Sequence, residues 1–162
     1  MWCAPLRVGR VERAEMQQLL VQRGANVHSK DQYDLTPLDR ASHQGHLEVV
    51  RFLIDSGADV NSHGGGAWTP LHSASRQGHV DIVESLIQHG ADVSERNNDQ
   101  ETPLHMASFS GNLKISRLIV ERGTEVDLRN KDGRTPLMAA SFFGHLDVAQ
   151  FFNRQRCRCE LL

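Results

Sequence analysis

Short apolar stretches alternate with polar, turn-forming stretches along this chain, and the alternation is regular. Each period holds two apolar patterns, and both have the spacing of one helix face. The first pattern is short and carries apolar residues three apart, as at Leu38 and Ala41. The second is longer, and the residues of its apolar stripe are Leu47, Val50, Phe52, Leu53 and Ile54. The pattern predicts pairs of short helices joined by polar connections.

The helix pairs recur at a fixed interval of 33 residues. Thr-Pro-Leu stands at 36–38, 69–71, 102–104 and 135–137, with no insertion or deletion between the copies. An Ala-Ser pair and then a glycine follow each copy at constant distances. A single helix pair cannot bury its own apolar face, whereas stacked pairs bury a continuous core. The period therefore predicts a solenoid of stacked units.

The bounds of each unit follow from its capping residues. Thr36 is a good helix N-cap, and Pro37 stands at the first helical position, where its missing N–H costs nothing. Gly45 is suited to end the first helix, because glycine tolerates a positive φ. Gly57 is expected to end the second helix in the same way.

Composition narrows the class of protein. The chain has 162 residues, a formal net charge of −2 and 23% charged residues, which indicates neither disorder nor a strongly basic nucleic-acid binder. No apolar run approaches the roughly 20 residues of a transmembrane helix, and the first residues do not resemble a signal peptide. The three cysteines, Cys3, Cys157 and Cys159, lie near the two ends. We therefore expect a reducing, intracellular compartment, cytoplasmic or nuclear.

Several phrases in the units resemble the ankyrin-repeat family. They are "TPLHSA" at 69–74, "TPLHMA" at 102–107, "GHLEVV" at 45–50, "GADVN" at 57–61 and "GADVS" at 90–94. The resemblance covers 31–153 and the half unit 15–31. It implies an all-α ankyrin-repeat solenoid of stacked helix-turn-helix units with β-turn fingers between them.

The resemblance also gives the domain organisation. An irregular segment, 1–11, precedes an ankyrin-repeat domain at 12–153, and a polar tail follows at 154–162. The tail is interpreted as a polar terminal cap, a frayed end or the mark of a longer array, and these three remain open. The units of the domain are a partial repeat, 12–30, and four repeats, 31–63, 64–96, 97–129 and 130–153.

The units depart from the family pattern at two positions. The family's finger glycine is kept only at Gly133, and Asp34, Ala67 and Gln100 replace it, so we expect fingers of altered shape, with the Gly-rich tip 64–68 the most mobile. The resemblance implies a Thr–His hydrogen bond in each unit. It is expected only in the two middle repeats, at His72 and His105, because the outer repeats carry Asp39 and Met138 there.

Metal binding and catalysis are not expected. Several of the nine histidines recur at the repeat period, which would hold them in a spaced row, and the pair His43 and His46 has no evident third ligand. The serines after each repeated alanine recur for packing, so none has the unique surroundings of a nucleophile. Three arginines in the tail, Arg154, Arg156 and Arg158, are a weak sign of nucleic-acid binding. We expect no cofactor and no enzyme activity.

The variable positions are expected to carry the function. In the family, the fingers and the outward positions late in each first helix form a concave face. Five of the nine aromatic residues of this chain fall there, and such residues dominate protein interfaces. One alternative is that Phe142 or Phe143 folds back and caps the last repeat. The candidate partner-binding residues are Tyr33, Leu35, His43, Trp68, Arg76, Phe109, Arg134, Phe142 and Phe143.

The sequence therefore predicts a monomeric, non-catalytic protein–protein interaction module, a scaffold that presents its concave face to a protein partner. The alternative is a fragment or regulatory subunit of a larger ankyrin-containing receptor or transcriptional co-regulator. A further hypothesis rests on "LIDSGADVN" at 53–61, which resembles the context of asparagine hydroxylation in animal ankyrin repeats, with Asn61 as acceptor.

Overall fold

The fold is a row of helix pairs. The computed structural model describes residues 26–159, with side chains described as far as residue 155, and within this range it contains helices and no strand. Besides a short 3-10 helix, η1 (Gly65–Ala67), the helices are α2 (Pro37–Gln44), α3 (Leu47–Asp55), α4 (Pro70–Gln77), α5 (Val80–Gln88), α6 (Pro103–Phe109), α7 (Leu113–Val120), α8 (Pro136–Phe142) and α9 (Leu146–Cys159).

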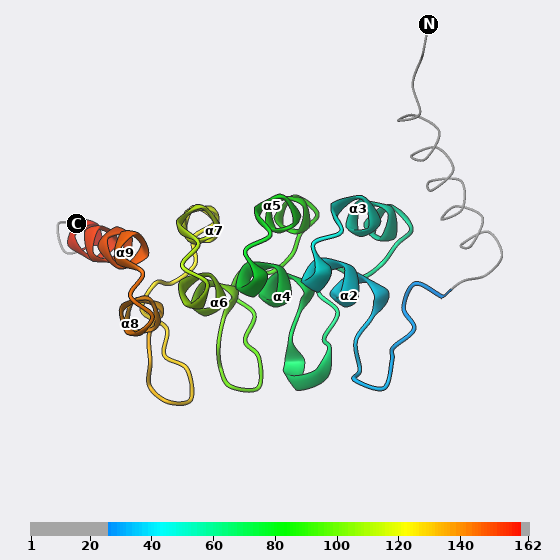
Figure 1. Cartoon of the computed structure of the whole chain (residues 1–162), viewed down its shortest axis with the longest axis horizontal. Coiled ribbons are helices and arrows are strands. Elements are labelled where there is room, and N and C mark those ends of the chain that lie inside the picture. The colour runs from blue at the N-terminus through cyan, green and yellow to red at the C-terminus, as the bar shows by residue number, and fades with distance from the viewer. Residues whose placement is uncertain (1–25, 160–162) are drawn as a thin grey trace, which may run out of the picture.

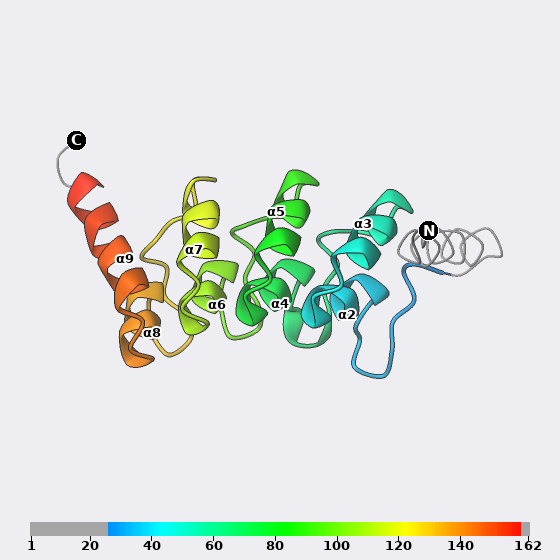
Figure 2. The ribbon, with the colours of Figure 1, turned by 45° about the horizontal axis from the view of Figure 1, so that its top comes forward.

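The helices form two rows, and long loops project from one of them (Figure 1). The inner row holds α2, α4, α6 and α8, and the outer row holds α3, α5, α7 and α9. The loops before the inner helices, here called the fingers, extend away from the outer row. Figure 2 shows the pairs following one another along the molecule in chain order. The expected all-α solenoid of stacked helix pairs is confirmed.

Each inner helix begins as the sequence predicts. The hydroxyl oxygen of Thr36 accepts a hydrogen bond from the backbone N–H three residues on, and the corresponding threonines of the other repeats do the same. Proline occupies the first turn each time. At the other end of α2, Gly45 adopts a left-handed conformation with φ of 82°. Helix α9 runs past residue 153, where the repeat pattern ends, to Cys159.

The core repeats with the sequence. Each inner helix contributes a leucine and, three residues later, an alanine to a continuous apolar layer, and the outer helices cover it. The leucines Leu38, Leu71 and Leu104 are fully buried. In the last outer helix, Phe152 fills the position that Leu53, Leu86 and Ile119 hold in the earlier repeats.

Hydrogen bonds between neighbouring repeats tie the turns within the helix pairs together. The imidazole Nε2 of His79 donates to the carbonyl of His43, 3.2 Å away, and Nε2 of His145 donates to the carbonyl of Phe109 at 3.0 Å. In the intervening repeat, the Asn112 amide donates to the carbonyl of Gly78. These periodic histidines are therefore structural links between repeats.

The four fingers share one backbone turn despite their different residues. Asp34, Ala67, Gln100 and Gly133 all have positive φ, between 58° and 74°. In three fingers a side-chain oxygen at the base accepts two backbone N–H groups; in the first this is Asp31, which binds the N–H groups of Tyr33 and Leu35. The second finger has Gly64 at that position, so it lacks the side-chain acceptor, and its turn includes the 3-10 helix η1. A Cβ at Gly64 would overlap the end of the Leu35 side chain, so a larger residue there would have to displace Leu35.

Candidate protein-interaction surface

The fingers and the exposed late positions of the inner helices form one surface, here called the recognition face. Most predicted partner-binding residues are accessible on it: Tyr33, His43, Arg76, Arg134, Phe142 and Phe143 are exposed, and Trp68 and Phe109 are half-buried. Leu35 differs from the rest, because its half-buried side chain packs against the backbone of Gly64 in the next finger.

Six of these residues form a continuous series of side-chain contacts in space. The guanidinium of Arg76 lies 5.7 Å from the ring centre of Trp68 and 6.0 Å from that of Phe109. The remaining ring separations are 5.3 Å from Phe109 to Phe143 and 5.1 Å from Phe143 to Phe142, both edge to face. The guanidinium of Arg134 lies 5.8 Å from the ring centre of Phe142. We call this set, Trp68, Arg76, Phe109, Phe143, Phe142 and Arg134, the aromatic–arginine row.

The row crosses three repeats and keeps its rings accessible. The Phe142 side chain is 76% exposed and that of Phe143 is 50% exposed. The alternative in which Phe142 folds back to cap the last repeat is therefore wrong, since its ring points into solvent. Phe143 packs partly on Phe109 of the preceding repeat. Its ring also stacks on that of His145, with 6.3 Å between the ring centres. Neighbouring repeats thus hold the rings in place without burying them.

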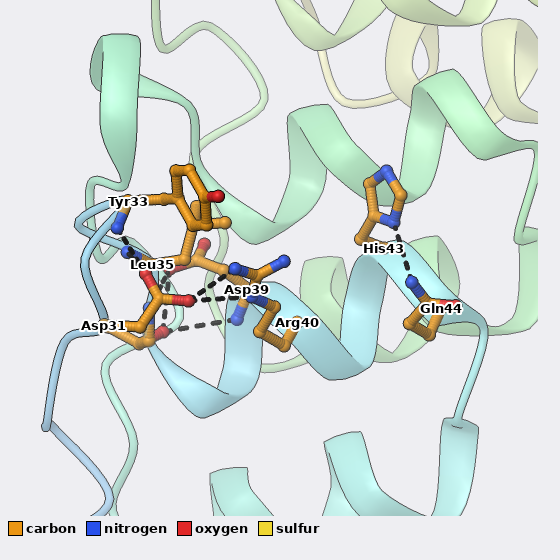
Figure 3. Close-up of polar contacts among 8 residues, drawn as sticks. Asp31, Tyr33, Leu35, Asp39, Arg40, His43 and Gln44 are labelled. Atoms are coloured by element: carbon orange, nitrogen blue, oxygen red, sulfur yellow. Dashed lines mark hydrogen bonds and ion pairs between the residues drawn. The ribbon is translucent and has the colours of Figure 1, made fainter.

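A second, smaller cluster lies on the first repeat (Figure 3). The guanidinium of Arg40 lies 5.4 Å from the Tyr33 ring centre, and its Nε donates to the Asp31 carboxylate at 2.9 Å. The hydrogen bond from Arg40 lowers the pKa of Asp31. Tyr33 is 61% exposed. Sequence reasoning missed Arg40, whose counterparts in the other repeats are the buried Ser73, Met106 and Ala139.

His43 lies near the other end of α2, where its Nε2 is 2.9 Å from the amide nitrogen of Gln77 on the next repeat. Figure 3 shows that it does not reach the Tyr33 cluster. His43 therefore belongs to the recognition face but contacts neither group of aromatic residues described above.

Two buried histidines tie their inner helices to the finger of the next repeat. His72 Nδ1 lies 2.8 Å from Oγ1 of Thr69, and its Nε2 donates to the Glu101 carbonyl of the next finger. His105 makes the same pair of contacts, with Thr102 and with the Arg134 carbonyl at 3.2 Å. The predicted Thr–His hydrogen bonds in the two middle repeats are confirmed. Burial lowers the pKa of His72 to about 4, and it also lowers the pKa of His105.

The first repeat lacks this bridge, because Asp39 replaces the histidine. One carboxylate oxygen, Oδ2, accepts from both the N–H and the hydroxyl of Thr36 at 2.8 Å. The other, Oδ1, is buried without a hydrogen-bond partner. Burial raises the pKa of this carboxyl group. The Trp68 carbonyl corresponds to the Glu101 carbonyl that His72 binds in the next repeat. Among the described residues, its only hydrogen-bond donor is the Gly64 N–H.

Replacing Asp39 with histidine is expected to raise the free energy of unfolding at pH 7 by about 1.5 kcal/mol. The imidazole keeps the contact with Thr36, adds a donor for the Trp68 carbonyl and removes a buried, half-satisfied carboxylate. Urea denaturation measures the change. The control Asp39→Asn relieves the charge without supplying the imidazole, so its gain should be smaller. A lower stability for Asp39→His than for the parent chain would contradict this account of the first repeat.

Other candidate chemistry has less structural basis. Among residues 26–155, no three metal-ligating side chains gather in one place. No helix in the described part of the chain has the length and apolar character needed to cross a membrane.

Asn61 joins two repeats: its amide donates to the Gly90 carbonyl, and its oxygen accepts from the Asp92 N–H at 2.8 Å. Hydroxylation of Asn61 stays a prediction. Cys157 and Cys159 lie beyond the described side chains.

Comparison with known proteins agrees with this architecture. A family model of ankyrin repeats matches the chain in three overlapping copies, at residues 8–97, 62–130 and 94–160. The comparison with curated proteins finds no match. The matched copies extend over nearly the whole length, and they include every helix described above. This chain belongs to the ankyrin-repeat family.

Proposed function

We propose that this protein is a non-catalytic protein–protein interaction module whose recognition face binds a protein partner. Ankyrin repeats generally mediate protein interactions. The observation that supports the proposal for this surface is the aromatic–arginine row. Large exposed rings and arginines are the residues that contribute most to binding energy at interfaces. Three or four repeats also offer the area of a standard interface, about 1,600 Å² in total.

The arrangement of the row favours binding through pre-organisation. Each ring or guanidinium contacts its neighbour in the row, so its side chain is already ordered before a partner arrives. A surface ordered in advance loses less conformational entropy on association. Phe142 would be the principal apolar anchor, because it has the largest exposed fraction among the large apolar residues described.

Replacing Phe142 with serine is expected to abolish capture of the partner from native lysate and to leave the melting temperature almost unchanged. The ring is exposed, so its loss removes binding area with little loss of packing. The measurement is quantitative mass spectrometry of proteins retained by the parent chain and the variant, with circular dichroism melts on both. The triple variant Phe109→Ser, Phe142→Ser, Phe143→Ser extends the test over the central rings.

The matched control is Leu146→Ser. Leu146 is 66% exposed, like Phe142, but it begins the outer helix α9 away from the fingers. This variant should retain the partner. Equal retention by the Phe142 variant and the parent chain would contradict the proposed surface, and a large drop in melting temperature for Phe142→Ser would mean that the ring serves packing.

A second candidate is a docking role inside a larger ankyrin-containing receptor or transcriptional co-regulator. It is favoured by the apolar surface of the last repeat. Leu146 is exposed there, although its counterparts Leu47, Val80 and Leu113 are half-buried. Met138, at the bridging-histidine position, is 48% exposed. Imaging of a tagged chain tests this candidate: nuclear enrichment favours a co-regulator, and cytoplasmic distribution favours the simple module.

A further inference from the structure

The two arginines of the aromatic–arginine row lack acidic partners within the described structure. The salt bridges found among the described residues include Arg40 with Asp31, but none of them involves Arg76 or Arg134. Both side chains are exposed. The row therefore has two unneutralised cations with the Phe109, Phe143 and Phe142 rings between them.

The cation–π contacts leave the N–H donors of both guanidiniums without a hydrogen-bond acceptor among the described residues. A guanidinium that lies over a ring uses its flat face for the cation–π contact, and its N–H groups point outward in the plane. That edge matches the two oxygens of a carboxylate. The contact of Arg76 with Trp68 and Phe109 thus fixes the cation and leaves its N–H donors available for a ligand.

Resting on the proposed function, we propose that the row binds an extended acidic peptide segment of the partner. Two carboxylate side chains of the segment pair with Arg76 and Arg134, and a large apolar side chain between them lies against Phe142 and Phe143. Successive centres between the two guanidiniums are 5–6 Å apart. An extended segment of about six or seven residues, at about 3.3 Å per residue, covers such a row.

A single-stranded nucleic acid also stacks on rings and pairs with arginines, but the fingers disfavour it. The last two fingers carry three carboxylates, at Asp99, Glu101 and Asp132. The ammonium of Lys131 lies 4.0 Å from the Asp99 carboxylate. Both oxygens of Glu101 are occupied by the amides of neighbouring asparagines. A nucleic acid carries a phosphate at every nucleotide and would meet these charges, whereas a peptide can place its two carboxylates at the arginines alone.

The test is selection of random dodecapeptides displayed on phage against the full chain, followed by titration of the enriched sequences as synthetic peptides. The titration uses the full chain with Trp2→Phe, which leaves Trp68 as the only tryptophan and makes its fluorescence a reporter of the row. We expect enriched peptides to carry two acidic residues flanking a large apolar one. Arg76→Gln and Arg134→Gln should each raise the Kd of such a peptide about tenfold.

The matched control is Arg122→Gln, which removes the same charge from an exposed position after the outer helix α7 and should leave the Kd unchanged. Added salt should weaken the binding of the peptides to the parent chain. Enriched peptides without acidic residues, or a Kd unaffected by both arginine variants, would overturn the acidic-peptide inference. If those peptides still require Phe142, the proposed function survives.

Two further outcomes separate the remaining possibilities. Peptides that bind independently of both Phe142 and the arginines would place the interaction elsewhere and count against the proposed function too. The absence of any enriched peptide would overturn the acidic-peptide inference, and capture of a folded partner would then test the recognition face separately. If a twelve-nucleotide poly(U) RNA binds as tightly as the peptides and competes with them, the acidic-peptide inference is overturned and the ligand of the row is a nucleic acid.

Discussion

Replacing Gly111 with alanine is expected to lower the free energy of unfolding by about 3 kcal/mol. Gly111 has a φ of 70°, where an L-residue costs about 1–2 kcal/mol. In addition, a Cβ at this position would overlap the imidazole of His145, which packs over the glycine and donates to the Phe109 carbonyl. Displacing that ring costs a further 1–3 kcal/mol, roughly the cost of overpacking a core. Urea denaturation at neutral pH measures the loss.

The next repeat supplies the matched control. Gly144 occupies the same repeat position with a φ of 75°, and a Cβ added there would meet no heavy atom within 4 Å beyond its immediate chain neighbours. Gly144→Ala should therefore show only the backbone strain, about 1–2 kcal/mol. Equal losses for the two variants would mean that the His145 contact contributes nothing. Because His145 also stacks on Phe143, the Gly111 variant should disturb binding at the recognition face as well.

Acidification from pH 7 to pH 5 is expected to lower the free energy of unfolding by about 2 kcal/mol through His72 alone. Its pKa is about 4 in the folded protein against 6.5 for an ordinary histidine, so the unfolded chain binds the proton first. The free energy of unfolding therefore keeps its full value above pH 6.5, as far as His72 is concerned, and decreases as the pH falls from 6.5 towards 4. His105, whose pKa is also lowered, adds to the loss in the same direction.

The measurement is urea denaturation across this pH range for the parent chain and for the variant His72→Gln, His105→Gln. The difference in unfolding free energy between the two chains should shrink as the pH falls, because only the parent chain carries the titrating imidazoles. Other groups titrate alike in both chains and cancel in this difference. A difference that stays constant from pH 7 to pH 5 would contradict the buried, neutral state of these histidines.

The helices and their bounds could be predicted because local residues determine them. Thr36 and Pro37 start α2 and Gly45 ends it, whatever the neighbouring repeats contain. The Thr–His contacts of the middle repeats also lie within one turn of helix, so the resemblance was enough to predict them. Helix α9 was harder, since the repeat pattern stops at residue 153 and the helix does not.

The arrangement of the candidate surface depends on contacts between repeats, which the register does not reveal. Register places Phe109 and Phe143 on the same side, but it does not show that their rings meet edge to face. The contacts of Arg76 with two rings and the pairing of Arg40 with Asp31 likewise depend on side-chain rotamers. The partner-binding role of Leu35 stays a prediction, and the sequence did not show that its side chain also packs on Gly64 in the next finger.

The position of the row has a consequence for cooperativity. In a stack whose units contact only their neighbours, each terminal unit is held by a single junction and opens most readily. Among the described residues, the helix pair α8–α9 contacts one neighbouring pair, α6–α7, and it carries Phe142 and Phe143. A ligand lying across Phe109 and Phe142 would bridge the junction between the last two repeats. Binding would therefore slow amide hydrogen exchange in α8 and α9 more than in the central repeats. The partner would suppress the local opening of this helix pair.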